Sequence, residues 1–171
     1  HAPAGAAYSA DGATGRGGGH VSILDDWNRG SRPELFVANY GPSGTLDFTT
    51  DVASIAGGSS LLDAGILALA DNDVLITWEV QAPSTVQGHF AVVDSAGALL
   101  SSGSVSAGGG ISGLAGMALP GGGFQLNWQA GGSAQAQTYT DQGQAGGRAP
   151  VSGPLAFTVL GSAGQYAVLQ G

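Results

Sequence analysis

Apolar and polar residues alternate along short stretches of this chain, and two of these stretches share one form. The segment VLITWEV (74–80) has an apolar residue at every second position, and Thr77 and Glu79 point away from that apolar face. The segment FQLNWQA (124–130) repeats the form with glutamine and asparagine as its polar residues. Alternation with a period of two predicts β-strands that bury one face.

The repetition extends along most of the chain. Trp27, Trp78 and Trp128 follow one another about fifty residues apart, and each closes a strand-like segment. Further strands are predicted around each tryptophan strand. One strand precedes it, as in GILALADND from Gly65 and LAGMALPGGG from Leu114. A second strand follows it, as in ELFVANYGPSG from Glu34, GHFAVVDSAG from Gly88 and AQAQTYTDQG from Ala134, and a third comes next, as in TLDFTTDVA from Thr45, ALLSSGSVSA from Ala98 and RAPVSG from Arg148. Four short strands per period is the composition of a propeller blade.

A glycine follows each second strand at a constant distance. Three residues separate Tyr40 from Gly44, Val93 from Gly97, and Tyr139 from Gly143. These glycines are expected in tight turns that need a positive φ.

The predicted fold is an all-β array of four-stranded antiparallel units, about three and a half propeller-like blades in a single repeat array over residues 1–171. The expected boundaries are about 6–54, 65–107 and 114–153, with a half-blade at 155–171. In the first copy Asp25 shares the face of Val21, Ile23 and Trp27, so its register is expected to differ or its unit to lie at an edge. Little helix is expected, because glycines interrupt the best helical candidate, Ser54–Ala70.

Three and a half blades do not close a ring, whose usual minimum is about four. The chain is therefore expected either to be a piece of a longer protein or to assemble with other copies. The half-blade from Leu155 to Gly171 would offer unpaired strand edges for that assembly.

Charge and composition restrict the partners. Twelve acidic residues against four basic ones give a formal net charge of −8, which disfavours nucleic acid and anionic membranes as partners. Cysteine is absent, so disulfide and thiolate chemistry are not expected. No apolar run is long enough for a membrane span, and no signal segment opens the sequence, which suggests a mature or excised piece.

Histidine suggests one metal site. If His1 were a mature N-terminus rather than a cut or numbering boundary, it would chelate copper through its amino group and its ring, as in lytic polysaccharide monooxygenases, with a second imidazole from His20 or His89. No two histidines have metal-site spacing, so a solvated terminal histidine is the preferred interpretation.

The tryptophans have two interpretations. They could stack on sugars, one per repeat, but each is in phase with the aliphatic face of its strand. Packing is therefore preferred for all three tryptophans, and for Tyr40 and Tyr139.

The acidic turns also have two interpretations. Asp71 and Asp73 around Asn72, and Asp25 and Asp26 beside Asn28, could supply oxygen to calcium. Turn formation explains these residues better, because EF-hand spacing is missing.

GGGISG from Gly108 has the spacing of a nucleotide-binding loop, but no helical pattern follows it, so a linker is expected. The sequence identifies no catalytic, cofactor-binding or metal residues.

Several segments together resemble a known class of repeat. ALADNDVLITWEV, GHFAVVDSAGALLSSGSVS, ALPGGGFQLNWQA and AQAQTYTDQGQAGG are similar to the fifty-residue β repeats of large secreted bacterial surface proteins and adhesins, which often accompany hemolysin-type calcium-binding segments. The calcium nonapeptide of those segments is absent here, and Gly41 and Thr140 stand where the second unit has Asp94. The resemblance implies export and a surface role, and supplies no catalytic residues.

The sequence thus predicts a non-enzymatic, extracellular structural or adhesive module that acts by self-association or by presenting loops to a glycan or protein. A carbohydrate-binding propeller of the lectin type is the first alternative, and a copper protein that uses His1 is the second.

Overall fold

The computed structural model describes the backbone of residues 8–14, 21–29, 32–105, 110–150, 156–159 and 166–169, and the side chains of residues 34–70, 72–105 and 110–147. In this part of the chain the fold is all-β, as predicted: three four-stranded antiparallel sheets and one two-stranded sheet, with no α-helix and one short 3-10 turn, Ala70–Asn72. No helix of the described residues is long and apolar enough to cross a membrane.

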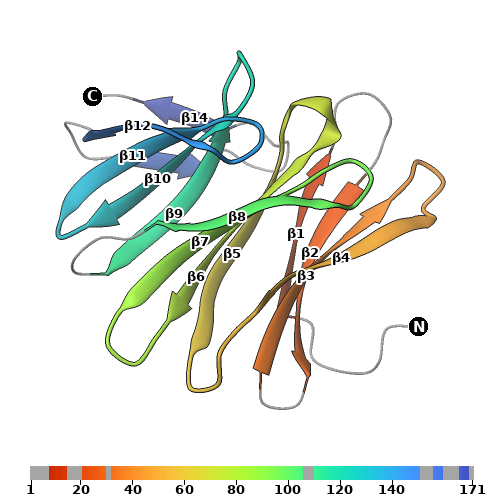
Figure 1. Ribbon diagram of the computed structural model, residues 1–171, viewed down its shortest axis with the longest axis horizontal. Helices are drawn as coiled ribbons and strands as arrows, with labels where there is room; N and C mark the ends of the chain where they lie inside the picture. Colours follow the sequence, from red (N-terminus) through yellow and green to blue (C-terminus); the bar gives the residue numbers. More distant parts are fainter. Residues whose placement is uncertain are drawn as a thin grey trace.

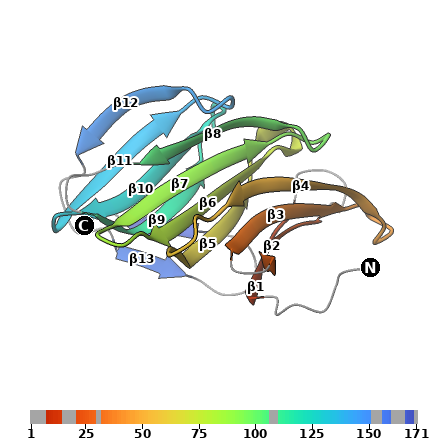
Figure 2. The same cartoon turned by 60° about the horizontal axis from the view of Figure 1, so that its bottom comes forward.

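Each four-stranded sheet is formed by consecutive strands joined by hairpins. Unit 1 contains β1 (Tyr8–Thr14), β2 (Val21–Arg29), β3 (Arg32–Tyr40) and β4 (Leu46–Ser54); unit 2 contains β5 (Ser60–Ala68), β6 (Val74–Gln81), β7 (Val86–Val93) and β8 (Leu99–Val105); unit 3 contains β9 (Ile111–Ala118), β10 (Phe124–Ala130), β11 (Ser133–Tyr139) and β12 (Ala145–Pro150). The hairpin of β13 (Ala156–Val159) and β14 (Tyr166–Leu169) follows. The three units succeed one another in chain order, and unit 2 lies between its neighbours (Figures 1 and 2).

The first strand of units 2 and 3 begins earlier than its alternation predicts. The ladder shifts between Leu61 and Asp63 on β5, and at the equivalent place on β9, where Gly113 has a φ of 66°. Each bulge adds one residue and so shifts the alternation of apolar and polar residues by one position. The part of the strand that precedes the bulge therefore does not continue the alternating pattern in the sequence. For the same reason the linker expected at Gly108 is shorter than predicted, since β9 begins at Ile111.

The turns after the second hairpin strands follow the predicted spacing. Gly44, Gly97 and Gly143 have φ values of 76°, 89° and 72°. The N–H of each glycine donates to the carbonyl of the residue three positions earlier. The N–H of that earlier residue in turn donates to the carbonyl of the residue that follows the glycine. In all three hairpins the turn ends in a bulge, and the glycine occupies the bulge position that requires a left-handed backbone conformation. The positive φ expected for these glycines is therefore confirmed.

The units pack through apolar faces, and unit 2 buries both of its own. One core joins units 1 and 2: Leu35, Val37, Val52 and Ile55 with Ile66, Val74, Ile76, Trp78, Val80, Ala91 and Val93. A second core joins units 2 and 3: Leu69, Leu75, Phe90, Val92 and Val105 with Ile111, Leu114, Phe124, Leu126, Trp128 and Tyr139. Residues 74–80 of β6 are all buried, Thr77 and Glu79 included. The alternation of β6 therefore separates two packed faces.

Unit 1 differs from the others in register, as its irregular pattern suggested. The ladder between β2 and β3 sets Val21 opposite Tyr40 and Trp27 opposite Glu34. Trp27 lies six residues beyond the start of its strand, whereas Trp78 and Trp128 lie four residues beyond theirs. Counted from the first residue of its strand, the tryptophan of unit 1 thus stands two residues later than those of units 2 and 3.

Candidate functional site

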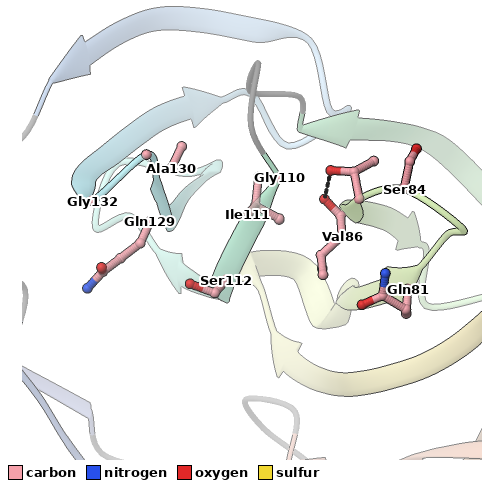
Figure 3. A pocket seen from close by; sticks show the side chains of 11 residues that line it. Gln81, Ser84, Val86, Gly110, Ile111, Ser112, Gln129, Ala130 and Gly132 are labelled. Atoms are coloured by element: carbon pink, nitrogen blue, oxygen red, sulfur yellow. Dashed lines mark hydrogen bonds between the residues drawn. The ribbon is translucent and has the colours of Figure 1, made fainter.

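A groove opens where the ends of units 2 and 3 meet (Figure 3). It has a volume of about 420 Å³. Its lining comes from the β6–β7 connection, the start of β9 and the β10–β11 turn: Gln81, Ser84, Thr85, Val86, Gly110, Ile111, Ser112, Gln129, Ala130, Gly131 and Gly132.

The groove exists because the two hairpin connections differ in length. In unit 2 Gln81 pairs with Val86, which leaves a four-residue connection that contains Pro83. In unit 3 Ala130 pairs with Ser133, which leaves only two glycines between the strands. The longer loop therefore extends past the shorter one and forms one wall of the groove.

Hydrogen bonds hold that wall in shape. The N–H of Ala82 donates to the carbonyl of Thr85 at 2.9 Å, and Nε2 of Gln81 donates to the carbonyl of Ala82 at 2.7 Å. The chain at Gly110 passes close by, since a Cβ at this position would lie 2.9 Å from Oγ1 of Thr85. The loop and the start of β9 thus leave no room for a side chain between them.

The described lining residues are mostly polar, and none of them is charged. Amides come from Gln81 and Gln129, and hydroxyls from Ser84, Thr85 and Ser112. Amides and hydroxyls both donate and accept hydrogen bonds, so the groove suits a neutral ligand with many hydroxyl or amide groups. Among the described residues that line the groove, none carries an imidazole, carboxylate or amine that would activate a nucleophile or transfer a proton.

The tryptophans of units 2 and 3 lie in the cores, which confirms the packing interpretation for both. Trp78 is 6% exposed and Trp128 is 1% exposed. The ring of Tyr139 stacks on Phe124 at a centroid distance of 5.0 Å and meets Phe90 at 4.7 Å. Tyr40 is partly buried, and the side chain of Trp27 lies outside the described residues.

The structure does not bring the predicted imidazoles together. His1 and His20 lie outside the described residues. His89 stacks on Trp78, with ring centroids 5.4 Å apart and an angle of 17° between the rings. Burial lowers the pKa of His89 below its usual 6.5, because desolvation disfavours the imidazolium ion. Among the described residues no three histidine, aspartate or glutamate side chains gather as a metal site would need.

Acidic residues in two hairpin turns hold the backbone. Oδ1 of Asp94 accepts hydrogen bonds from the N–H groups of Ala96 and Ala98, at 2.9 and 2.7 Å. A carboxylate oxygen of Asp141 accepts a hydrogen bond from the N–H of Gly123 in the neighbouring hairpin.

The acidic turn of unit 2 is partly described. Asn72 has a φ of 64°, the left-handed conformation of a turn residue. The side chains of Asp71, Asp25 and Asp26 lie outside the described residues.

One polar contact has no counterpart in the predictions. Oε1 of buried Glu79 accepts a hydrogen bond from the N–H of Leu114, at 2.6 Å, across the boundary between units 2 and 3. At the equivalent bulge of unit 2 the N–H of Ala64 is bound by Oδ1 of Asp63 at 2.9 Å. Unit 3 has Gly113 in the place of Asp63 and so lacks this local acceptor.

Comparisons of this chain with protein-family models, with curated proteins and with solved structures found no match.

Proposed function

We propose that this protein is a non-enzymatic structural or adhesive module that works outside the cell, at a bacterial surface or in its matrix. It acts by self-association or by presenting the loops at the ends of its stacked sheets. The likeness of its repeats to those of secreted surface proteins supports this proposal.

The observation that carries the proposal is the burial of the apolar and aromatic side chains of unit 2 between its neighbours. Both faces of β6 are buried, so the apolar and aromatic residues of this unit serve the packing of one sheet on the next. Stacked sheets of this kind form a rigid body whose loops and strand edges remain for contact with partners. Structural support and loop presentation require only this rigid body and its loops.

The groove between units 2 and 3 favours a second candidate, the binding of a neutral glycan. Its amide and hydroxyl lining can exchange hydrogen bonds with sugar hydroxyls. The form of this candidate that relies on Trp78 or Trp128 as a stacking platform is wrong, because both rings are buried. Binding in the groove would therefore leave tryptophan fluorescence largely unchanged.

Binding of the purified chain to immobilised neutral polysaccharides and to beads coated with the chain itself tests the proposal. We expect the protein to bind at least one of these two surfaces. Gln129→Ala should reduce retention on polysaccharide if the groove is the adhesive site, whereas Gln144→Ala, an exposed glutamine outside the groove, should not. A chain that binds neither surface contradicts the structural and adhesive role.

A further inference from the structure

Polar side chains in the groove between units 2 and 3 remain available to a ligand. Within the described part of the chain, the side chains of Ser84, Ser112 and Gln129 make no hydrogen bond to the protein. The amide of Gln81 donates one N–H to the carbonyl of Ala82 at 2.7 Å, and its Oε1 and its second N–H stay free. This bond also restrains the Gln81 side chain, so the free part of the amide is held in place for a ligand.

The two amides of the groove come from different units. Gln81 alternates in phase with Leu75 and Glu79, which contact unit 3, so it belongs to the face of β6 that is turned toward unit 3. In unit 3 the ladder sets Gln129 of β10 opposite Ser112 of β9, which makes them cross-strand neighbours. Figure 3 shows Ser112 between Gln81 and Gln129. A ligand in the groove therefore has an amide at either side and a hydroxyl between them.

A carboxamide has a particular match among neutral ligands. Its carbonyl oxygen accepts hydrogen bonds and its amino group donates them, and the two lie side by side. Two hydroxyl groups on neighbouring carbon atoms fit this arrangement, because one can donate to the oxygen while the other accepts from the nitrogen. Sugar rings carry such vicinal pairs. Carboxylate and sulfate groups only accept, the described lining offers them no positive charge, and the net charge of −8 repels them.

The lining offers little to ligands of other kinds. None of its described residues is aromatic, and the largest apolar one, Ile111, is only 5% exposed. A peptide bound in extended form gains specificity from pockets for its side chains, and such a lining has little apolar surface to form them. Binding in this groove therefore depends on hydrogen bonds, which favours a ligand with many hydroxyl groups.

We infer that the groove binds neutral glycans through vicinal hydroxyl pairs, and that Gln81 and Gln129 recognise these pairs. Its volume of about 420 Å³ is within the range of about 300–1,000 Å³ that small-molecule sites have, so it takes a short stretch of a glycan chain. The inference rests on the glycan-binding route of the proposed function. It adds the chemical group that the ligand must carry.

The test removes the vicinal pairs from a ligand that is otherwise kept neutral and hydroxylated. Beads carry amylose or galactomannan, whose rings hold hydroxyl pairs in two different relative orientations. Half of each batch is treated with periodate, which cleaves the carbon–carbon bond between adjacent hydroxyl-bearing carbons, and then with borohydride, which reduces the aldehydes to alcohols. The product keeps hydroxyl groups, but no two of them stand on neighbouring carbons. Gelatin beads provide a polypeptide surface.

Three variants are compared with the wild-type chain. Gln81→Ala and Gln129→Ala each remove one amide of the groove, and Gln144→Ala removes an exposed amide outside it. All three positions are exposed, so the cores are left intact, and circular dichroism verifies the strands. Frontal affinity chromatography measures the dissociation constant of each protein on each surface.

We expect the wild-type chain to bind at least one intact polysaccharide at least about tenfold more tightly than its cleaved form, the effect of two hydrogen bonds of ordinary strength. Gln81→Ala and Gln129→Ala should each lose most of this preference, and Gln144→Ala should keep it. Equal binding to intact and cleaved polysaccharide overturns the inference, and so does a preference that survives in both groove variants. A chain that binds gelatin or its own copies but neither polysaccharide also overturns it, while the structural and adhesive role would stand.

Discussion

At the scale of single residues, two polar side chains, those of Glu79 and Thr50, join neighbouring sheets. The carboxylate of Glu79 reaches from unit 2 to the N–H of Leu114, which the β9 bulge releases from its ladder. The hydroxyl of Thr50 donates in the same manner, from unit 1 to the carbonyl of Gly97 in unit 2, at 2.6 Å. Such contacts orient the sheets, because a buried donor left without an acceptor is costly.

Replacement of Glu79 tests this contact. Glu79→Ala should lower the free energy of unfolding by about 2 kcal/mol, since the N–H of Leu114 loses its acceptor in a buried place. Glu79→Gln keeps an acceptor oxygen and should lose clearly less. Chemical denaturation with urea measures both variants. Equal losses for the two would mean that the hydrogen bond is not the source of the effect.

His89 should make the fold sensitive to acid. Its pKa is lowered in the folded state, so below pH 6.5 the unfolded chain binds the proton more readily than the folded chain. Well above pH 6.5 the ionisation of His89 therefore has no effect on the free energy of unfolding. As the pH falls through 6.5 toward the folded pKa, proton uptake by the unfolded chain lowers that free energy.

Thermal unfolding across this pH range measures the effect. His89→Gln is the matched variant, because unit 3 has Gln135 opposite Trp128 where unit 2 has His89 opposite Trp78. The variant should lose less stability than the wild type on acidification. Identical pH profiles for the two proteins would contradict the role of His89.

At the scale of elements, the recurring hairpin turn also serves as a contact between units. In unit 2 the turn that contains Gly97 lies against β4, and a Cβ on Gly97 would come within 2.7 Å of the ring of Phe48. In unit 3 a Cβ on Gly143 would meet Ser101 of β8 in the same way. In unit 1 a Cβ on Gly44 would meet nothing within 4 Å.

The two glycines Gly44 and Gly97 therefore form a matched pair. Gly44→Ala should lower the free energy of unfolding by about 1 kcal/mol, because alanine adopts the left-handed backbone conformation less readily than glycine. Gly97→Ala should cost at least about 1 kcal/mol more, because Phe48 or the turn must also move. Urea denaturation of both variants gives the comparison. Equal costs would show that the turn does not press on unit 1.

At the scale of the whole molecule, unit 2 links the two cores. Its strands β6 and β7 contribute to both, through Ile76 and Ala91 on one face and Leu75 and Val92 on the other. The described array therefore has its most deeply buried backbone in the middle unit and less at the outer strands, such as β4 and β8.

Amide hydrogen exchange should follow this arrangement. The amides of β6 and β7 are expected to exchange most slowly, since they open only when both cores are disrupted. Amides of β4 provide the internal comparison and should exchange faster, since β4 is an outer strand with five exposed residues along its nine. Slower exchange in β4 than in β6 would contradict the central role of unit 2.

Much of the fold follows from local pattern. The alternation in segments 74–80 and 124–130 indicated strands, and the recurring glycines indicated hairpin turns with positive φ. Both are local properties: side chains alternate along any strand, and only glycine readily adopts the left-handed turn position. The first residues of β5 and β9 escaped prediction because a bulge reverses the phase within each strand.

The candidate groove could not be predicted in this way. It depends on a four-residue connection in unit 2 and a two-residue connection in unit 3 that come together only when the sheets stack. The polar residues that line it, such as Gln81 and Gln129, have no spacing that marks a site in the sequence.

By itself, then, the sequence determined the strand content, the four-stranded repeat and the positions of the turns, because each depends on neighbours along the chain. Only the tertiary structure decided that both faces of β6 are buried and that Glu79 binds the N–H of Leu114. These features depend on which sheet lies against which. Residues that are far apart in sequence create them, and no local pattern records their proximity.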